Sequence, residues 1–226
     1  LDRRHQPLLD CWVLVAKGRG ARPIEWVNQP ERRISRRCPF CSGNEADTPP
    51  ALAKFPTRGA GDWRVRVVAN KYPAVHDAAC DEAVNFGAVS NVTGFRVSTS
   101  VATGEPTALF RAAGAGGAHE VVIESPRHVD GFGMLDGEEA RWAVRAWQDR
   151  LAHHARDPRW SYGLLIKNFG VGGGASLEHV HSQVIATQWI PSAVRNKCGR
   201  LAWWRRQHGD CLVCQLIDEE QRAAQR

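Results

Sequence analysis

The chain has 226 residues, of which 43% are hydrophobic and 24% are charged, and it carries a formal net charge of +6. These proportions are ordinary for a soluble globular protein, and the length allows one large domain with a substantial core. No run of about 18 or more apolar residues occurs, which excludes a conventional transmembrane helix. Since the first residues also lack the apolar core of a secretory signal, we expect a cytoplasmic protein without a membrane partner.

The cysteine content indicates metal binding rather than a disulfide framework. Seven cysteines are present, an odd number that includes two Cys-x-x-Cys pairs, whereas small secreted domains use an even set. The positive charge suits an anionic ligand, but the basic residues are scattered, with concentrations only at 31–37 and 195–206. We therefore do not expect nucleic acid as a partner. The cysteines stand at positions 11, 38, 41, 80, 198, 211 and 214.

Three strands are predicted before residue 125. Residues 8–16 form an apolar run, and residues 64–69 alternate and then run apolar until Asn70, where a loop begins. Residues 111–118 are almost all Ala and Gly, which is typical of a flexible connection. Residues 119–124 follow as a strand that a Ser-Pro pair stops. Binding residues are common at such strand ends.

Residues 136–155 carry the clearest helical pattern in the sequence. Asp136 is a candidate N-cap, and Glu139 completes a capping box with it. The apolar residues recur on one face, so we interpret the segment as a packing helix. That face comprises Ala140, Ala143, Val144, Trp147 and Leu151.

Two further strands are predicted after this helix. Residues 161–168 form a strand that a run of glycines interrupts, and residues 177–187 resume the alternation. Strands that are separated by a helix and linked by glycine turns predict an α+β fold with a mainly antiparallel sheet and flanking helices. A parallel arrangement also fits the pattern.

The first Cys-x-x-Cys pair has an echo near the end of the chain. The Cys-Pro-Phe-Cys sequence at 38–41 recurs as Cys-Leu-Val-Cys at 211–214, and an incipient helix follows from Gln215. We therefore predict one unit at residues 1–200 and the start of a second, incomplete half at 201–226.

The strand at 177–187 brings chemically useful side chains to one surface. Alternate residues of a strand point to the same side, so Leu177, His179, His181 and Gln183 are expected to share a face. A lone histidine is more often structural, but two imidazoles and an amide behind a glycine-rich loop indicate a functional site.

The spacing of Cys38 and Cys41 allows two thiolates to meet one tetrahedral zinc ion, which needs two further ligands. His128 and one of the two strand histidines can supply them. Cys-x-x-Cys also serves redox proteins, where the first cysteine begins a helix after a strand. The Pro- and Arg-rich surroundings favour zinc here.

The histidine that does not bind zinc is free to act as a nucleophile toward phosphorus. Gln183 could donate to a phosphoryl oxygen as charge builds. The glycine-rich loop at 168–176 could bring backbone N–H groups to a phosphate, with Ser176 as a further donor. Arg19 and Arg22 either neutralise phosphates or are solvated surface residues.

These motifs resemble the galactose-1-phosphate uridylyltransferase family of the histidine-triad superfamily. The similarity runs through most of residues 7–190 and implies a histidine-triad-like fold for the first half. Its motifs are Arg19-Gly-Ala-Arg22-Pro23, Cys38-Pro-Phe-Cys41, Asn70-Lys-Tyr-Pro73, Glu120 to His128, and Asn168 through Gln183.

The resemblance implies a role for each motif residue. His179 would be the fourth zinc ligand, and His181 would attack the α-phosphorus of UDP-glucose to give a uridylyl-histidine. A hexose 1-phosphate, typically galactose 1-phosphate, would then take the uridylyl group in a ping-pong cycle, and the family forms homodimers. The implied nucleotide contacts are Arg19, Arg22, Asn70, Lys71, Tyr72, Asn168, Ser176 and Gln183.

Four positions refine this expectation. The hydrolase branch of the superfamily usually has a third histidine where this chain has Gln183, so transfer is favoured over hydrolysis. The family usually has proline where this chain has Val180. Cys211 and Cys214 resemble half of the second zinc site of related plant-type ADP-glucose phosphorylases. The alternatives are an ADP-glucose or dinucleotide phosphorylase and, from another class, a non-catalytic zinc module that binds nucleotides or RNA.

Overall fold

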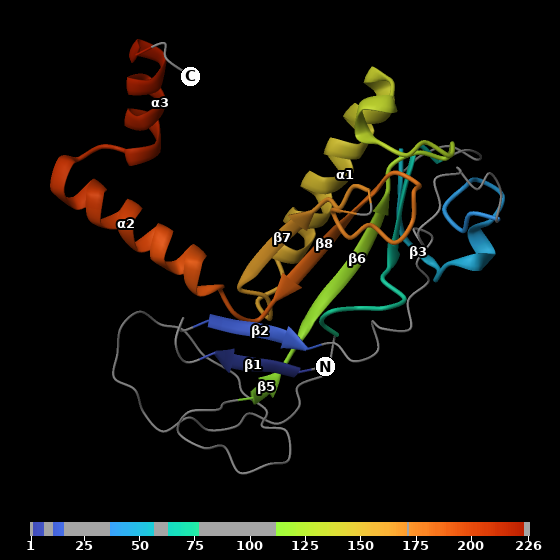
Figure 1. The fold of residues 1–226 in the computed structure, drawn as a ribbon, viewed down its shortest axis with the longest axis horizontal. Helices are drawn as coiled ribbons and strands as arrows, with labels where there is room; N and C mark the ends of the chain where they lie inside the picture. The colour runs from blue at the N-terminus through green and yellow to red at the C-terminus, as the bar shows by residue number, and fades with distance from the viewer. Residues whose placement is uncertain are drawn as a thin grey trace.

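Two antiparallel sheets and three helices organise the part of the chain that the computed structural model describes (Figure 1). The structure describes residues 2–6, 11–15, 37–56, 63–76, 112–170 and 172–223. The strands are β1 (Asp2–Gln6), β2 (Cys11–Val15), β3 (Ala51–Phe55), β4 (Val65–Ala69), β5 (Ala112–Gly114), β6 (Gly117–Ile123), β7 (Tyr162–Ile166) and β8 (His181–Thr187). The helices are α1 (Gly137–Ala155), α2 (Ser192–His208) and α3 (Leu212–Ala223), with 3-10 turns η2 (Glu45–Asp47) and η3 (Phe132–Met134).

The larger sheet has the strand order β3-β4-β6-β8-β7, and the smaller one has the order β2-β1-β5. Every ladder between these strands is antiparallel, which confirms the predicted α+β fold with a mainly antiparallel sheet. Within the described segments, no helix has the length and apolarity needed to cross a bilayer.

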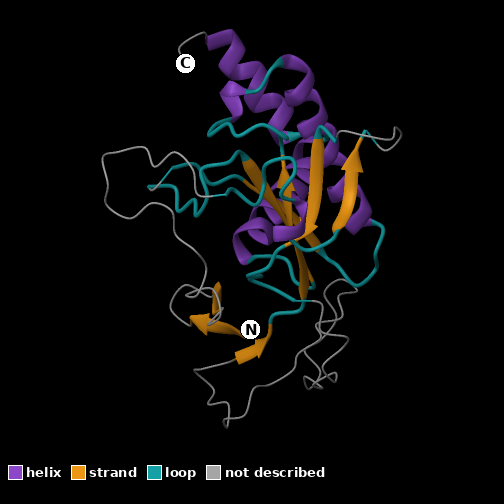
Figure 2. Ribbon diagram, turned by 90° about the vertical axis from the view of Figure 1, so that its right-hand side faces the viewer, coloured by secondary structure: helices purple, strands orange, loops and turns teal. Residues whose placement is uncertain are grey.

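One face of the larger sheet packs against α1 (Figure 2). Val67, Val122 and Val184 come from three neighbouring strands and are fully buried against Ala143 and Ala146 of the helix. Because side chains alternate along a strand, the residues directly before and after each of these valines point to the opposite face of the sheet.

The opposite face of the sheet supports the Cys-x-x-Cys segment. Val68, Val121 and Ile123 pack beneath Cys38 and Phe40 in a second buried cluster. The sheet therefore separates a packing side, covered by α1, from a side that holds the predicted site.

The structure confirms the predicted helix start and corrects its buried face. The side chain of Asp136 accepts hydrogen bonds from the backbone of Glu138 and Glu139, and the capping box is complete. Val144, which we placed on the packing face, is 39% exposed. The buried residues of α1 are Glu139, Ala143, Ala146, Arg150 and His154.

The prediction of a flexible connection at 111–118 was wrong for its described part. β5 and the start of β6 occupy it, and Ala113 and Ala115 are buried. A Cβ on Gly117 would lie 2.4 Å from the carbonyl oxygen of Ala186. Small residues stand here because strands approach closely, and not because the segment is flexible.

The predicted strand at 177–187 begins later than expected. β8 starts at His181, so Leu177 and His179 lie in the preceding turn and the alternation argument holds only from His181 onward. The N–H of Val180 donates to the carbonyl of Val129 at 2.7 Å. This bond ties the turn to the loop that follows β6, and a proline at this position could not make it.

The last two helices extend away from the sheets (Figure 1). α2 was not predicted, and α3 begins at Leu212, three residues before the predicted start. None of the described residues in either helix is buried.

Candidate active site and metal centre

The structure brings together Cys38, Cys41, His128 and His179. Their potential ligand atoms, two sulfurs and two imidazole nitrogens, all lie within 4.8 Å of one another. The residues come from three separate segments: the cysteine loop, the loop after β6 and the turn before β8. The fold thus gathers the residues that the sequence analysis proposed for one ion.

The spacing within this cluster fits a tetrahedral zinc ion. Sulfur-to-Nδ1 distances are 3.5 Å for Cys38 and His179, 3.6 Å for Cys41 and His179, and 3.4 Å for Cys41 and His128. Bonds of about 2.3 Å to sulfur and about 2.0–2.1 Å to nitrogen at tetrahedral angles would separate the two atoms by about 3.6 Å. The set of two thiols and two imidazoles therefore has both the chemistry and the size that zinc requires.

Hydrogen bonding orients His179 for a metal. Its Nε2 lies 2.8 Å from the carbonyl oxygen of Ser125, which can only accept, so Nε2 carries the proton. The lone pair of Nδ1 then faces the two sulfurs. Burial lowers the pKa of His179 to about 4, which keeps the imidazole neutral and available as a ligand.

Burial also raises the pKa of the Cys38 thiol to about 12, and the nearby Cys41 adds to this effect. A divalent ion bound here would displace the thiol proton and balance the charge of the resulting thiolate.

His181 is held in one tautomer at the start of β8. Its Nδ1 lies 2.7 Å from the carbonyl oxygen of His179, so Nδ1 is protonated and Nε2 keeps its lone pair. Burial lowers the pKa of His181, so the ring is neutral at neutral pH. A neutral imidazole with an unprotonated Nε2 is a competent nucleophile.

Phe40 joins the metal cluster to this histidine. Its ring makes edge contacts with His179 and His181, at centroid distances of 5.9 and 5.3 Å. A residue between the two cysteines thus packs against both imidazoles, so the cysteine loop also shapes the surroundings of His181.

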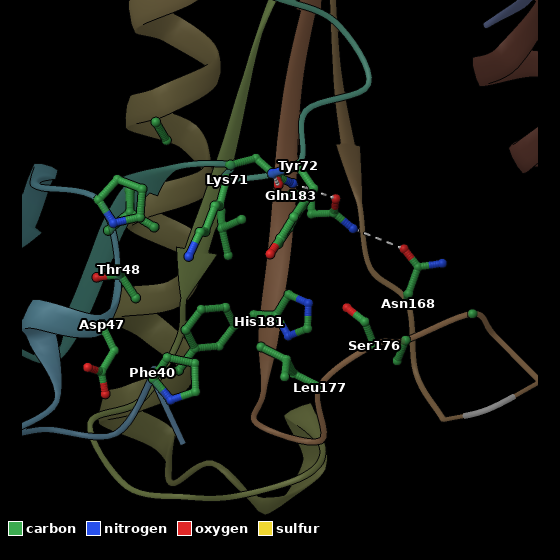
Figure 3. Close-up of a pocket in the computed structure, with 18 residues that line it drawn as sticks. Phe40, Asp47, Thr48, Lys71, Tyr72, Asn168, Ser176, Leu177, His181 and Gln183 are labelled. Atoms are coloured by element: carbon green, nitrogen blue, oxygen red, sulfur yellow. Dashed lines mark hydrogen bonds between the residues drawn. The ribbon is translucent and has the colours of Figure 1, made fainter. Parts of the chain in front are cut away.

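A pocket opens beside His181 (Figure 3). The Cys-x-x-Cys loop, the loop after β4 and the glycine-rich loop form its walls. All six predicted nucleotide contacts that the structure describes line it, whereas Arg19 and Arg22 lie outside the described residues. The lining includes Pro39, Phe40, Asp47, Thr48, Asn70, Lys71, Tyr72, Asn168, Ser176, Leu177, His181 and Gln183.

Gln183 lies next to His181 along the same strand face, as Figure 3 shows. Its Nε2 donates to Oδ1 of Asn168 at 3.2 Å. Asn168 in turn donates from Nδ2 to the carbonyl of Gly173 at 2.5 Å. The glycine-rich loop is therefore tied to the strand that carries His181.

The second cysteine pair lies apart from this site. Cys211 and Cys214 are exposed at the start of α3, and within the described part of the chain no third ligand joins them. The hypothesis that they form half of a second zinc site stays a prediction.

Sequence reasoning missed three buried or half-buried residues around His181, namely Lys167, Glu124 and His119. Lys167 donates to the carbonyl of His181 at 3.2 Å and pairs with the fully buried Glu124, which also accepts from Ser182. His119 contacts Gln183 from β6. His119 shares a strand face with Val121, which lines the pocket, but the sequence of β6 alone does not show which residues of β8 lie opposite it.

Comparison with known proteins gives consistent similarities. The family model for galactose-1-phosphate uridyl transferase, N-terminal domain, matches residues 1–191. ADP-glucose phosphorylase of Arabidopsis thaliana is 26% identical over 96% of this chain and 59% of its own length. Galactose-1-phosphate uridylyltransferase of Thermotoga maritima is 23% identical over 97% of this chain and 57% of its own length.

Solved structures share the fold. A uridylyltransferase structure superposes with a TM-score of 0.64 at 24% identity, covering 97% of this chain and 56% of that chain. The Arabidopsis ADP-glucose phosphorylase with bound ADP-glucose gives a TM-score of 0.63 at 24% identity, covering 96% of this chain and 59% of that one. This chain thus spans less than two thirds of the relatives it matches. Since the family model covers most of its residues, the chain belongs to the galactose-1-phosphate uridyl transferase family.

Proposed function

We propose that the chain carries the nucleophilic half of a nucleotidyltransferase that acts on nucleotide sugars. The observation that carries this proposal is the protonation of His181. Its imidazole is neutral, Nδ1 donates its proton to the carbonyl of His179, and Nε2 keeps its lone pair. The ring lines a pocket with polar residues on several sides. Membership of the family supports the same chemistry.

The first step forms one bond and breaks one. Nε2 of His181 attacks the α-phosphorus, and the bond from that phosphorus to the bridging oxygen breaks, so a sugar 1-phosphate leaves with the bond electrons. Gln183 is placed to donate an N–H to the phosphoryl oxygen as negative charge develops. In the second step an acceptor oxygen attacks the phosphorus and releases Nε2.

The favoured reaction is UDP-glucose:hexose-1-phosphate uridylyltransfer with galactose 1-phosphate as the typical acceptor, by a ping-pong cycle. Support comes from the named relatives with this activity and from glutamine, rather than histidine, at position 183. The proposed substrate contacts are Arg19, Arg22, Asn70, Lys71, Tyr72, Asn168, Ser176 and Gln183.

A second candidate reaction is ADP-glucose phosphorolysis, in which inorganic phosphate is the acceptor. The similarity to the Arabidopsis ADP-glucose phosphorylase motivates it. Both reactions share the first half of the cycle through His181 and differ in the base and the acceptor.

We further propose that Cys38, Cys41, His128 and His179 hold a zinc ion with a structural role. The ion would balance the thiolate charge and fix the loop that carries Phe40. Zinc content of the purified protein, measured by atomic emission, should be about one ion per chain for a single four-ligand site.

The division into a first half at residues 1–200 and the start of a second at 201–226 is also a proposal, as is a homodimer. Light scattering of the protein as it elutes from a size-exclusion column would test the dimer, because a molar mass equal to that of one chain would contradict it.

Intact mass after incubation with UDP-glucose or ADP-glucose tests the catalytic proposal. We expect a uridylyl-sized gain with UDP-glucose, and an adenylyl-sized gain with ADP-glucose would favour the phosphorylase reaction. His181→Asn is the control, because its amide can still donate to the His179 carbonyl but it lacks the nucleophilic nitrogen. If neither donor leaves an adduct on the wild-type protein, the proposal is wrong.

A further inference from the structure

His119 is a buried histidine that the proposed reaction does not use. It lies on β6, is 6% exposed, and contacts the side chain of Gln183 on the neighbouring strand. The register pairs Val121 with Gln183, so His119 is two residues along on the same face of the sheet. An imidazole at this place needs an explanation, because it faces the site and not the packing side.

The proton of His119 is fixed by a backbone group. The N–H of Ala74 donates to Nδ1 at 2.9 Å, and a backbone N–H can only donate, so Nδ1 is the acceptor. Nε2 therefore carries the proton and donates to Oε1 of Gln183 at 2.8 Å. These two hydrogen bonds therefore require that Oε1 of Gln183, and not its Nε2, faces His119.

The other end of the network is fixed by a backbone carbonyl. The carbonyl oxygen of Gly173 can only accept, so Asn168 must present Nδ2 to that oxygen, at 2.5 Å. Oδ1 of Asn168 then faces the other neighbour of this side chain. That neighbour is Nε2 of Gln183, at 3.2 Å. Both backbone ends thus impose the same orientation on the Gln183 amide.

Asn70 reinforces the same orientation. Its Oδ1 accepts from the backbone N–H of Tyr72 at 2.8 Å, which turns Nδ2 toward Oε1 of Gln183 at 3.3 Å. Nε2 of His119 donates to the same oxygen at 2.8 Å, and the 3.0 Å contact between Nδ2 of Asn70 and Nε2 of His119 joins two donors and is not a hydrogen bond. The donors of His119 and Asn70 hold the carbonyl end of the amide away from Asn168.

We propose that His119 is a positioning residue that fixes the Gln183 amide with its N–H donors toward the reacting phosphate. The inference rests on the proposed function of His181. An amide nitrogen carries two hydrogens, and Asn168 uses one, so the other can serve a phosphoryl oxygen. A flipped amide would present a carbonyl oxygen to that anion and would repel it.

A positioning role has a kinetic signature. The Gln183 donor acts most strongly when charge develops on the phosphoryl oxygen, whereas substrate binding relies on many other contacts. Loss of His119 should therefore lower kcat and leave KM nearly unchanged. Loss of one donor to a developing oxyanion typically costs about 100- to 1000-fold, so a donor left in place but disordered should cost roughly 10- to 100-fold.

Two variants separate position from bulk. His119→Asn keeps an acceptor for the Ala74 N–H but is too short to reach Gln183, whereas His119→Gln places an amide donor near the former Nε2. We expect His119→Asn to slow single-turnover nucleotidyl transfer to His181 by roughly 10- to 100-fold and His119→Gln to recover most of the rate. His154→Asn controls for loss of a buried histidine, because His154 is 5% exposed and contacts Glu120, away from the pocket.

A double-variant cycle tests whether His119 acts through Gln183. In a Gln183→Ala background, His119→Asn should cause no further loss of rate, because the amide it positions is gone. An undiminished additional loss would overturn the inference, and so would an unchanged rate in His119→Asn alone.

The orientation can also be measured without activity, which separates this inference from the proposed function. In ¹⁵N NMR spectra the His119 ring should show a protonated Nε2 and an unprotonated Nδ1. A wild-type protein that forms no adduct but shows this tautomer would refute the proposed function and retain the positioning network. A proton on Nδ1 would overturn the inference whatever the activity.

Discussion

Gly173 shows how little space the glycine-rich loop leaves at one residue. A Cβ on Gly173 would lie 2.3 Å from the carbonyl oxygen of Phe169, which is a backbone atom of the same loop, whereas a Cβ on Gly172 would meet nothing within 4 Å. Gly173→Ala must therefore shift the backbone of the loop, including the carbonyl of residue 173 that accepts from the side chain of Asn168. We expect Gly173→Ala to lower kcat/KM by at least about tenfold, since small displacements of positioning groups are costly, and Gly172→Ala to change it little.

Melting temperatures measured alongside would separate this effect from general unfolding. Equal kcat/KM values for the two alanine variants would show that the close approach in the loop has no bearing on the site.

At the residue scale, the sequence predicted what depends on local spacing. Two cysteines three residues apart indicate a metal pair on their own. His119 escaped notice because its importance depends on which residue of β8 lies opposite Val121, and pairing register is not legible from one strand. The turn conformation of His179 also depends on tertiary contacts, namely those with Ser125 and the cysteines.

At the scale of elements, Glu120 links β6 to α1 through a buried ion pair. Arg150 donates to its carboxylate at 2.8 and 2.7 Å, and His154 contacts it at 3.0 Å. Burial alone would raise the pKa of Glu120, but these partners outweigh burial and lower the pKa to about 2. A carboxylate with a lowered folded pKa stabilises the fold above its unfolded pKa of 4.5, and this stabilisation disappears as pH falls toward 2. We expect the loss to be ~3 kcal/mol.

Urea unfolding of wild type and Glu120→Gln between pH 7 and pH 2 would measure this. The difference in unfolding free energy between the two proteins should narrow by ~3 kcal/mol across the acidic range. Glu138→Gln, on the exposed first turn of α1, controls for the loss of one charge. A constant difference between wild type and Glu120→Gln would contradict the assigned role of the ion pair.

Elements with strong local signals were predicted well, and those defined by packing were not. α1 begins at its predicted cap because Asp136 and Glu139 satisfy the first backbone N–H groups locally. The Ala- and Gly-rich segment at 111–118 was predicted to be flexible from its composition. The small residues are instead required by close packing, such as the approach of Ala186 to Gly117, which a sequence does not show. α2 has neither a side-chain N-cap nor a buried face, so its sequence has no cap or apolar periodicity from which a helix could be predicted.

For the whole molecule, the proposed zinc ion would connect three segments distant in sequence. Its ligands come from the cysteine loop, the loop after β6 and the turn before β8, so losing the ion removes a link across the site face. We expect a strong chelator to lower the melting temperature by roughly 10 °C, taking a loss of about 3–4 kcal/mol for an ion present at about 100 to 1,000 times its Kd and about 2–4 °C per kcal/mol. Cys41→Ser should lose zinc and respond little to chelator, whereas Cys198→Ser, at an exposed position on α2, should resemble wild type. A chelator-insensitive wild type would contradict the metal site.

The proposed reaction passes through a covalent nucleotidyl intermediate on His181, which isotope exchange can detect. Labelled glucose 1-phosphate is incubated with the protein and unlabelled nucleotide sugar, with no second acceptor present. A ping-pong cycle through His181 predicts that label enters the nucleotide sugar with wild type and not with His181→Asn. If label enters only when a second acceptor is added, or enters equally with the variant, the two substrates react without a histidine intermediate and the account is wrong.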